Sequence, residues 1–231
     1  MAFLYIVATP IGNLEDITLR ALRILKEVDL ILAEDTRVTK KLLNFYKIKT
    51  QVISYHQHSS AKRIQEIINL LKEEKNIALV SDAGTPGISD PGSKLIKKVI
   101  EELGFKVKIV PIPGPSALIC AASVSGFPMS KFVFLGFPPT KKKRKNFFEK
   151  VISSKYPVIF YESPYRILNT LKELNQSYHL KRDNVNEVDQ VVVCKELTKK
   201  FEKIYRGKIE EVIEEIKKDK IKGEFVVIVG K

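Results

Sequence analysis

Residues 3–33 read FLYIVATPIGNLEDITLRALRILKEVDLILA, and their pattern defines the class of fold. Phe3–Ala8 is a short apolar run, typical of a strand buried on both faces. The apolar positions from Ile17 to Val28 recur at helical spacing, and Asp16 stands where it can cap that helix. Leu30–Ala33 is a second buried strand. A strand, a helix and a strand in this order predict parallel strands joined by a right-handed crossover.

The alternation continues along the chain and predicts two α/β domains, divided at the proline-rich segment 111–115. Residues 1–114 are expected to form an N-terminal domain with a mainly parallel sheet. Residues 115–231 are expected to form a C-terminal domain with a mixed sheet, because the short connections after Cys194 favour antiparallel pairing. In this domain we expect a helix over 165–174, a loop over 175–189 and a strand over 201–205.

Composition indicates the kind of partner. The 231 residues include 40 Lys and Arg against 27 Asp and Glu, a net charge of +13, which favours a polyanion such as nucleic acid. A lysine-rich composition without function is the alternative. No apolar run approaches the roughly 18 residues of a membrane span, so we expect no membrane partner. The spacing of the two Cys and three His predicts no metal site and favours reduced thiols in the cytoplasm.

The densest basic run follows Thr140. Like charges in sequence repel one another, so the run is expected on a solvated loop or helix start that faces an anion. A solubilising turn is the alternative interpretation. The run consists of Lys141, Lys142, Lys143, Arg144 and Lys145.

Four unusual loops follow predicted strands, at the edge of a parallel sheet where ligands bind. They are residues 9–13, 34–37, 81–92 and 111–116. The third loop holds three Gly, two Pro and two Asp, and glycines let backbone amides approach a ligand closely. A rigid structural turn would have the same composition. The sequence has no P-loop lysine and no clean G-x-G-x-x-G, which disfavours nucleotide hydrolysis and Rossmann dinucleotide binding.

Seven motifs together resemble the tetrapyrrole-methylase superfamily, from about residue 4 to the C-terminus with order and spacing kept. Within it they are most similar to the branch that methylates the 2′-hydroxyl of a decoding-site cytidine in 16S ribosomal RNA. The motifs are YIVATPIGNLEDIT at 5–18, AEDTR at 33–37, SDAGTPGISDPG at 81–92, PGPSA at 113–117, FYESP at 160–164, KELTK at 195–199 and GEF at 223–225.

The resemblance implies a homodimer that binds S-adenosylmethionine in a cleft between the two domains. The implied cofactor-binding residues are Pro10, Asp82, Gly84, Thr85, Gly87, Ser116, Ala117, Tyr161 and Gly223. The chemistry agrees, because Asp82 at a strand end suits the ammonium or ribose of the cofactor. A helix that starts near Ser116 would also offer free amides.

A ribose hydroxyl is a weak nucleophile, so a positioned base is expected to take its proton. Asp35 is the leading candidate, with Arg37 holding it or binding phosphate; a local Asp35–Arg37 ion pair is an equal alternative. Glu162 is a second candidate, and a helix cap is its alternative role.

Contacts to RNA are predicted from the basic run at 141–145 together with His56, His58, Lys62, Arg63 and Arg166. For the two histidines, an exposed polar loop is an equally good interpretation.

Two other functions stay open at this point. One is C-methylation of a uroporphyrinogen-like tetrapyrrole, which is also acidic. The other is a ribosome-binding protein that keeps the fold without catalysis. The Asp82 loop and the 160–164 motif favour the RNA branch over the first, and the complete set of cofactor loops disfavours the second.

Overall fold

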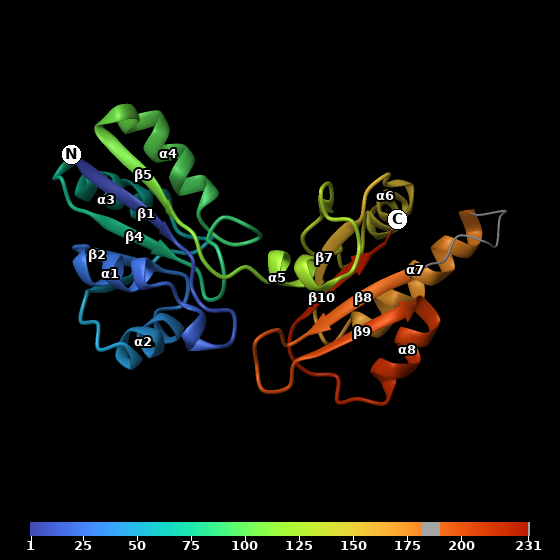
Figure 1. The fold of residues 1–231 in the computed structure, drawn as a ribbon. Helices are drawn as coiled ribbons and strands as arrows, with labels where there is room; N and C mark the ends of the chain where they lie inside the picture. The colour runs from blue at the N-terminus through green and yellow to red at the C-terminus, as the bar shows by residue number, and fades with distance from the viewer. Residues whose placement is uncertain (182–189, 231) are drawn as a thin grey trace. The chain divides into compact units, whose positions relative to one another are not determined.

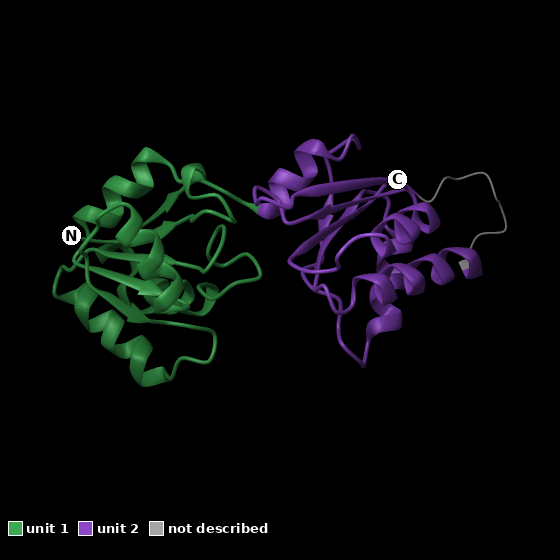
Figure 2. Ribbon diagram, turned by 90° about the horizontal axis from the view of Figure 1, so that it is seen from below, with its two compact units in different colours: residues 1–116 green, residues 117–231 purple. Residues whose placement is uncertain are grey.

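The structure is a computed structural model, and it describes residues 1–181 and 190–230. The chain divides into two compact units, residues 1–116 and 117–231 (Figure 2). Each unit has its own sheet and its own buried core.

Unit 1 is built on a five-stranded sheet in the order β3-β2-β4-β1-β5, and all four pairings are parallel (Figure 1). A parallel sheet needs a crossover between strands, and each crossover here carries a helix. The elements are β1 (Ala2–Val7), α1 (Leu19–Glu27), β2 (Leu30–Ala33), α2 (Thr36–Phe45), β3 (Val52–Ser54), α3 (Ala61–Lys72), β4 (Ile77–Val80), α4 (Ser93–Leu103) and β5 (Val107–Ile112), with short 3₁₀ turns at Leu14–Asp16 and Gly104–Lys106.

Both faces of this sheet are buried, which explains why its strands read as continuous apolar runs. On one face, Leu4, Leu32 and Leu79 pack with apolar residues of α3 and α4. On the other face, Ile31 and Ala78 pack with residues of α1 and α2. Successive residues of a strand therefore serve two different cores.

Unit 2 contains a mixed sheet in the order β6-β7-β10-β8-β9. Strands β6 and β7 are parallel, and the other three pairings are antiparallel. The prediction of two α/β domains, one mainly parallel and one mixed, is confirmed. The elements are α5 (Ala117–Val124), β6 (Val133–Phe134), α6 (Arg144–Ser153), β7 (Val158–Glu162), α7 (Ile167–Lys181), β8 (Gln190–Lys195), β9 (Lys203–Lys208), α8 (Ile209–Lys217) and β10 (Phe225–Val229).

The core of unit 2 lies between the sheet and helices α6, α7 and α8. Phe148, Leu171 and Val212 of these helices pack with Phe160 and Val227 of the strands. The short helix α5 contacts β7 and β10, so it also packs on this sheet.

Several predicted boundaries are wrong. Helix α1 begins at Leu19, and its cap is Thr18, whose Oγ1 accepts a hydrogen bond from the Ala21 N–H at 3.1 Å. Asp16 instead ends a 3₁₀ turn. Helix α7 continues to Lys181, through the first part of the loop predicted at 175–189; residues 182–189 lie outside the described residues. Strand β9 lies two to three residues later than predicted.

Within the described ranges 1–181 and 190–230, no helix has both the length and the apolar character needed to cross a bilayer.

Candidate active site

The five parallel strands of unit 1 place five loops at one edge of the sheet. Thr9 lies just beyond β1, Glu34 follows β2, His56 lies just beyond β3, Ser81 follows β4 and Pro113 follows β5. Ala33 is paired with Ser54 on one side and with Val80 on the other. The loops that begin at residues 34, 55 and 81 are therefore direct neighbours.

Three of these loops are joined by hydrogen bonds. Thr9 and Gly84 form an antiparallel bridge, with the Thr9 N–H donating to the Gly84 carbonyl at 2.9 Å and the Gly84 N–H donating back at 3.0 Å. Thr9 Oγ1 donates to the Ser81 carbonyl at 3.1 Å, and Thr85 Oγ1 donates to the Pro115 carbonyl at 3.2 Å. The loops after β1, β4 and β5 form one connected ridge.

Two glycines allow this close approach. Gly84 has a φ of +82°, a left-handed conformation that other residues rarely adopt. At Gly114, a Cβ atom would stand 3.0 Å from the Cβ of Ala8, so a larger residue would separate the loops after β1 and β5. The two glycines therefore let the backbones of the loops after β1, β4 and β5 pack closely on one another.

The adjacent carboxylates Glu34 and Asp35 have different environments. Asp35 caps helix α2, and its carboxylate accepts hydrogen bonds from the Arg37 N–H at 2.8 Å and from the guanidinium at 2.6 to 3.2 Å. These bonds lower the pKa of Asp35 to about 2. Of the two predicted alternatives, the structure contains the Asp35–Arg37 ion pair. A carboxylate with so low a pKa is a weak base and therefore a poor proton acceptor at neutral pH.

Glu34 has the opposite environment, and the sequence analysis did not select it. Burial raises its pKa, and the negative charge of Asp82 raises it further; the Asp82 N–H and His56 offset part of this rise. Asp82 also reaches the same loop, since its Oδ1 accepts from the Asp35 N–H at 2.8 Å. Neighbouring carboxylates whose pKa values are pushed apart are a common mark of acid–base chemistry. The AEDTR motif contains both Glu34 and Asp35, but the sequence does not show which of these two carboxylates pairs with Arg37.

The other predicted contacts of unit 1 are spread more widely. His56 and His58 are exposed beyond β3, with ring centroids 6.3 Å apart. Lys62 is exposed on α3, whereas Arg63 pairs with Glu66 at 2.8 Å and lines a groove of about 600 Å³ between α3 and the strands β2 and β3. Only the two histidines share the edge with Glu34.

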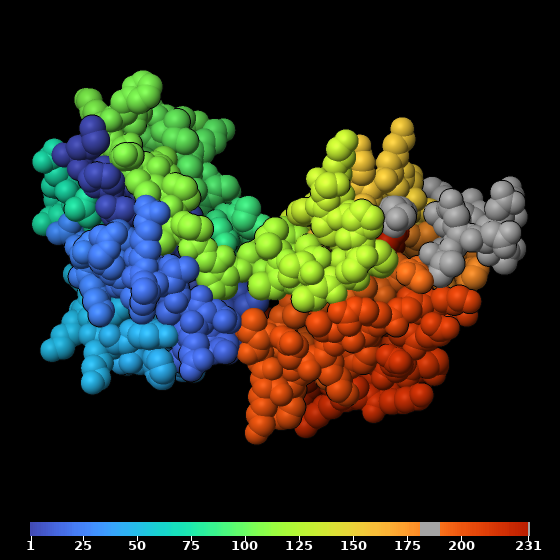
Figure 3. All heavy atoms as spheres, in the orientation of Figure 1, coloured from blue at the N-terminus to red at the C-terminus, as the bar shows by residue number. Residues whose placement is uncertain are grey.

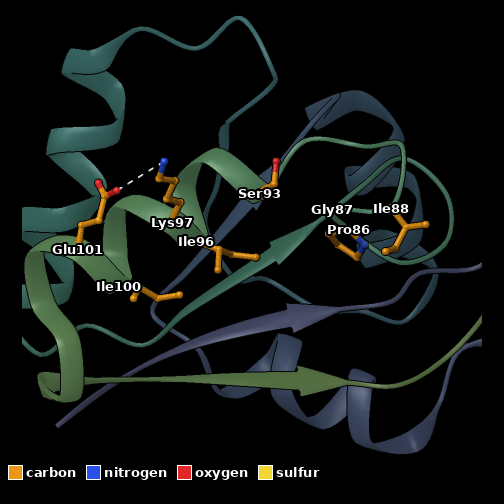
Figure 4. Close-up of a pocket in the computed structure, with 8 residues that line it drawn as sticks. All are labelled: Pro86, Gly87, Ile88, Ser93, Ile96, Lys97, Ile100 and Glu101. Atoms are coloured by element: carbon orange, nitrogen blue, oxygen red, sulfur yellow. Dashed lines mark ion pairs between the residues drawn. The ribbon is translucent and has the colours of Figure 1, made fainter. Parts of the chain in front are cut away.

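A second groove, of about 480 Å³, lies along α4 (Figure 4). Gly87 lines it together with Pro86 and Ile88, while Ile96 and Ile100 form much of its apolar wall. Of the nine residues predicted to bind the cofactor, Gly87 alone lines this groove.

Glu162, predicted as a second candidate base, is held by contacts within unit 2, which disfavour that role. Its side chain is fully buried, and both carboxylate oxygens are engaged. Oε1 accepts from the Ser163 N–H and pairs with Arg166, each at 2.7 Å; Oε2 accepts from Thr170 Oγ1 at 2.6 Å. A carboxylate held in this way supports structure and has no route to a substrate proton.

The basic run is divided between two roles. Lys141, Lys142, Lys143 and Lys145 are exposed. The Arg144 side chain is only 12% exposed, and it bonds to Glu173 at 2.7 Å and to Thr170 at 2.6 Å. Arg144 and Arg166 are therefore internal contacts of unit 2, and their prediction as RNA contacts is corrected.

The predicted cofactor residues of unit 2 lie in two places. Tyr161, at the end of β7, contacts the rings of Phe134 and Phe137. Gly223 has a φ of +87°, and a Cβ there would overlap the carboxylate of Glu196. Glu196 in turn bonds to the Glu224 N–H at 3.0 Å and to Lys199 at 2.8 Å. Residues 195–199 and 223–225, recognised as separate motifs, are thus one contact cluster.

In the described parts of the chain, no group of three His, Cys, Asp or Glu side chains is arranged to hold a metal ion. Pro10, Thr85, Ser116 and Ala117 are partly exposed. The site of unit 1 therefore consists of backbone groups, small residues and carboxylates.

Comparison with known proteins identifies the class. Residues 3–213 match the family of tetrapyrrole (corrin/porphyrin) methylases, and the chain belongs to this family. The resemblance read from the motifs is confirmed.

Individual relatives are more specific. The chain is 48% identical over 230 residues to the ribosomal RNA small subunit methyltransferase I of Thermotoga maritima, covering 100% of this chain and 99% of that one. It is 44% identical to the protein of the same name from Bacillus subtilis, covering 99% of this chain and 75% of that one.

Solved structures share the fold. A diphthine synthase aligns over 100% of this chain and 90% of its own, with a TM-score of 0.71 and 14% identity. The uroporphyrin-III-C-methyltransferase from Thermus thermophilus aligns over 99% of this chain and 94% of its own, with a TM-score of 0.66 and 17% identity. At this level of identity the likeness concerns the fold alone.

Proposed function

We propose that this protein methylates the 2′-hydroxyl of a decoding-site cytidine in 16S ribosomal RNA with S-adenosylmethionine as donor. The observation that carries the proposal is the 44–48% identity, over nearly the whole chain, to relatives named ribosomal RNA small subunit methyltransferase I. The tetrapyrrole alternative is supported by the family match and the likeness of fold, neither of which is as specific as these relatives.

The donor fits the ridge formed by the loops after β1, β4 and β5. Gly84 and Gly114 let these loops pack closely on one another, and the exposed Asp82 side chain in the loop after β4 can receive an ammonium or ribose. When bound, S-adenosylmethionine supplies an electrophilic methyl group. The residues proposed to hold it are Pro10, Asp82, Gly84, Thr85, Gly87 and Ser116 in unit 1, and Ala117, Tyr161 and Gly223 in unit 2.

Glu34 is the proposed base. Its carboxylate lies at the sheet edge beside Asp82, without the arginine pair that holds Asp35. In this role a carboxylate oxygen of Glu34 would take the proton of the ribose 2′-hydroxyl while the 2′-oxygen bonds to the methyl carbon and the bond from that carbon to the donor sulfur breaks. Asp35 then has a positioning role, since it caps α2 and fixes the backbone next to Glu34. The exposed guanidinium of Arg37 is placed to receive an RNA phosphate.

A labelled methyl-transfer assay on purified small ribosomal subunits tests the function. We expect label in RNA that resists alkaline cleavage, because a 2′-O-methyl group blocks attack on the adjacent phosphate. Label in tetrapyrrole, or no uptake of the donor in calorimetry, would refute the proposal.

The base is tested by Glu34→Gln, with Asp35→Asn as the matched control. We expect Glu34→Gln to lower the rate about 10²- to 10⁴-fold and to leave the affinity for S-adenosylmethionine within a few-fold. Asp35→Asn should be less damaging. The opposite order of rates would return the role of base to Asp35.

Two further properties belong to the proposal. A ribosomal RNA substrate implies a cytoplasmic location, and the family resemblance implies a homodimer. Sedimentation equilibrium measures the second directly: a mass of one chain at micromolar concentration would exclude the dimer.

A further inference from the structure

The segment that carries the basic run is held by an unusual set of contacts. Strands β6 and β7 are parallel, and the Tyr161 N–H donates to the Gly136 carbonyl at 2.9 Å. The chain beyond each strand therefore leaves from the same edge of the sheet. Residues 136–143 lie beyond β6, and residues 163–166 lie beyond β7.

Two arginines fix the first of these segments. Arg166 donates to the Pro138 carbonyl, and Arg144 donates to the Pro139 carbonyl, each at 3.0 Å. Proline has no N–H, so these carbonyls are the only backbone hydrogen-bonding groups of the two residues. Both arginines are anchored on the buried Glu162, Arg166 directly and Arg144 through the Thr170 hydroxyl. The segment is thus rigidly supported from the interior.

Each of the two segments, beyond β6 and beyond β7, carries an exposed aromatic ring. Phe137 is 54% exposed and Tyr165 is 95% exposed. The inner edge of the Phe137 ring packs on Tyr161, with centroids 5.5 Å apart, which fixes its orientation. The stretch of chain that connects α5 to α6, coloured light green to yellow in Figure 3, lies on the surface of unit 2. Because the Phe137 ring is held by Tyr161, it loses little conformational freedom when a flat group stacks on it.

Charge indicates what kind of molecule covers these rings. Lys141, Lys142 and Lys143 lie within six residues of Phe137, and all three are exposed. Lys145, the second residue of α6, is also exposed. An apolar protein segment or a lipid tail would cover the rings but would leave four ammonium groups without a negatively charged partner. Single-stranded nucleic acid offers both unpaired bases for stacking and phosphates for the lysines.

We propose that Phe137, Tyr165 and the lysines at 141–143 and 145, together called the aromatic–lysine surface, bind single-stranded RNA by base stacking and phosphate contact. The inference rests on the proposed function, since it names how that RNA substrate is held. It assigns the stacking to two residues outside the basic run, and it gives Arg144, Arg166 and Glu162 the role of internal support.

Binding of a fluorescently labelled 12-nucleotide single-stranded RNA, measured by anisotropy over a range of salt concentrations, separates the two kinds of contact. Phe137→Ala and Tyr165→Ala should each weaken binding about 5- to 100-fold, with an unchanged salt slope. Replacing Lys141, Lys142 and Lys143 with Gln should instead lower the salt slope by about 2. Tyr165→Phe should bind as the wild type does, because stacking does not need the hydroxyl.

Phe105→Ala and Phe201→Ala are matched controls, because both remove exposed rings elsewhere on the protein. The proposal is overturned if Phe137→Ala and Tyr165→Ala bind this RNA as tightly as the controls do. It is also overturned if the wild type prefers the duplex of the same sequence.

Calorimetric binding of S-adenosylmethionine distinguishes a failure of the RNA-binding proposal from a failure of the methyltransferase proposal. Binding of S-adenosylmethionine should be the same in the wild type and in Tyr165→Ala, which also verifies that this variant is folded. If the wild type did not bind S-adenosylmethionine, the proposed methyltransferase function would be refuted. The RNA-binding result would not be affected.

Discussion

At the scale of single residues, Glu34 illustrates how a partly buried carboxylate can reduce stability as it ionises. Burial and the charge of Asp82 raise its pKa above the ordinary value, so the folded protein binds this proton more tightly than the unfolded chain does. The stabilising contribution is complete below the ordinary glutamate pKa of about 4.3. It is lost as the pH rises through the raised pKa of the folded state.

Glu34→Gln removes this dependence, because glutamine stays uncharged at every pH. We expect the free energy of unfolding of the variant to match the wild type below about pH 4 and to exceed it progressively as the pH rises. Urea unfolding across this range measures the difference. Asp35→Asn is the control of opposite sign, since the lowered pKa of Asp35 stabilises the wild type at neutral pH. A difference for Glu34→Gln that does not change with pH would contradict the argument.

Gly223 and Gly126 form a natural pair for a second residue-scale test. Both have a left-handed φ, +87° and +79°, but a Cβ at Gly223 would overlap Glu196, whereas a Cβ at Gly126 would meet nothing within 4 Å. Alanine at either position carries the backbone cost of about 1–2 kcal/mol. Gly223→Ala should lose clearly more, because it also displaces the contact between residues 196 and 224. Equal losses in urea unfolding would show that the close approach has no energetic weight.

At the scale of elements, the sequence predicted which strands and helices exist better than where they begin. The apolar runs of β1, β2 and β4 need no other signal, because both of their faces are buried. Helix α1 is different, since Asp16 and Thr18 are both acceptable caps. Leu19 fits the apolar periodicity yet is 86% exposed. Local pattern alone does not determine which of two nearby caps the packing of Ala21 and Leu25 selects.

The cap itself can be tested. Thr18→Ala should lower the free energy of unfolding by about 1 kcal/mol, because the Ala21 N–H loses its acceptor. Asp16→Ala should change it by no more than about 0.5 kcal/mol. Urea unfolding of the two variants at equal pH makes the comparison. A larger loss for Asp16→Ala would mean that the helix starts where the sequence pattern placed it.

In the candidate site, the sequence likewise predicted the position of the loops but not the roles of the individual side chains. Loops 9–13, 34–37 and 81–92 were predictable as neighbours, because successive parallel strands bring their carboxyl ends to one edge. The roles of individual acids were not. Asp35 and Glu162 looked like bases in the sequence, and each is held by an arginine two or four residues away. Such a spacing permits an ion pair, but the side-chain conformations of the folded protein decide whether it forms, so the sequence leaves both roles open.

At the scale of the whole molecule, the cores are separate. One buried cluster lies within unit 2, and two lie within unit 1 on opposite faces of its sheet. None of the three contains residues from both units. The two units therefore have separate hydrophobic cores, so the chain does not have to unfold in a single transition.

Cavity substitutions of the same kind in each unit test this separation. Leu79 in β4 and Leu171 in α7 are fully buried in different clusters, and replacing either with alanine should cost about 2–5 kcal/mol locally. We expect Leu79→Ala to speed amide hydrogen exchange in β1, β2 and β4, and to leave β7 and β10 within error of the wild type. Leu171→Ala should give the reverse pattern, because each cavity weakens only the cluster that contains it. If either substitution accelerated exchange equally in both sheets, the two units would be one cooperative body in spite of their separate cores.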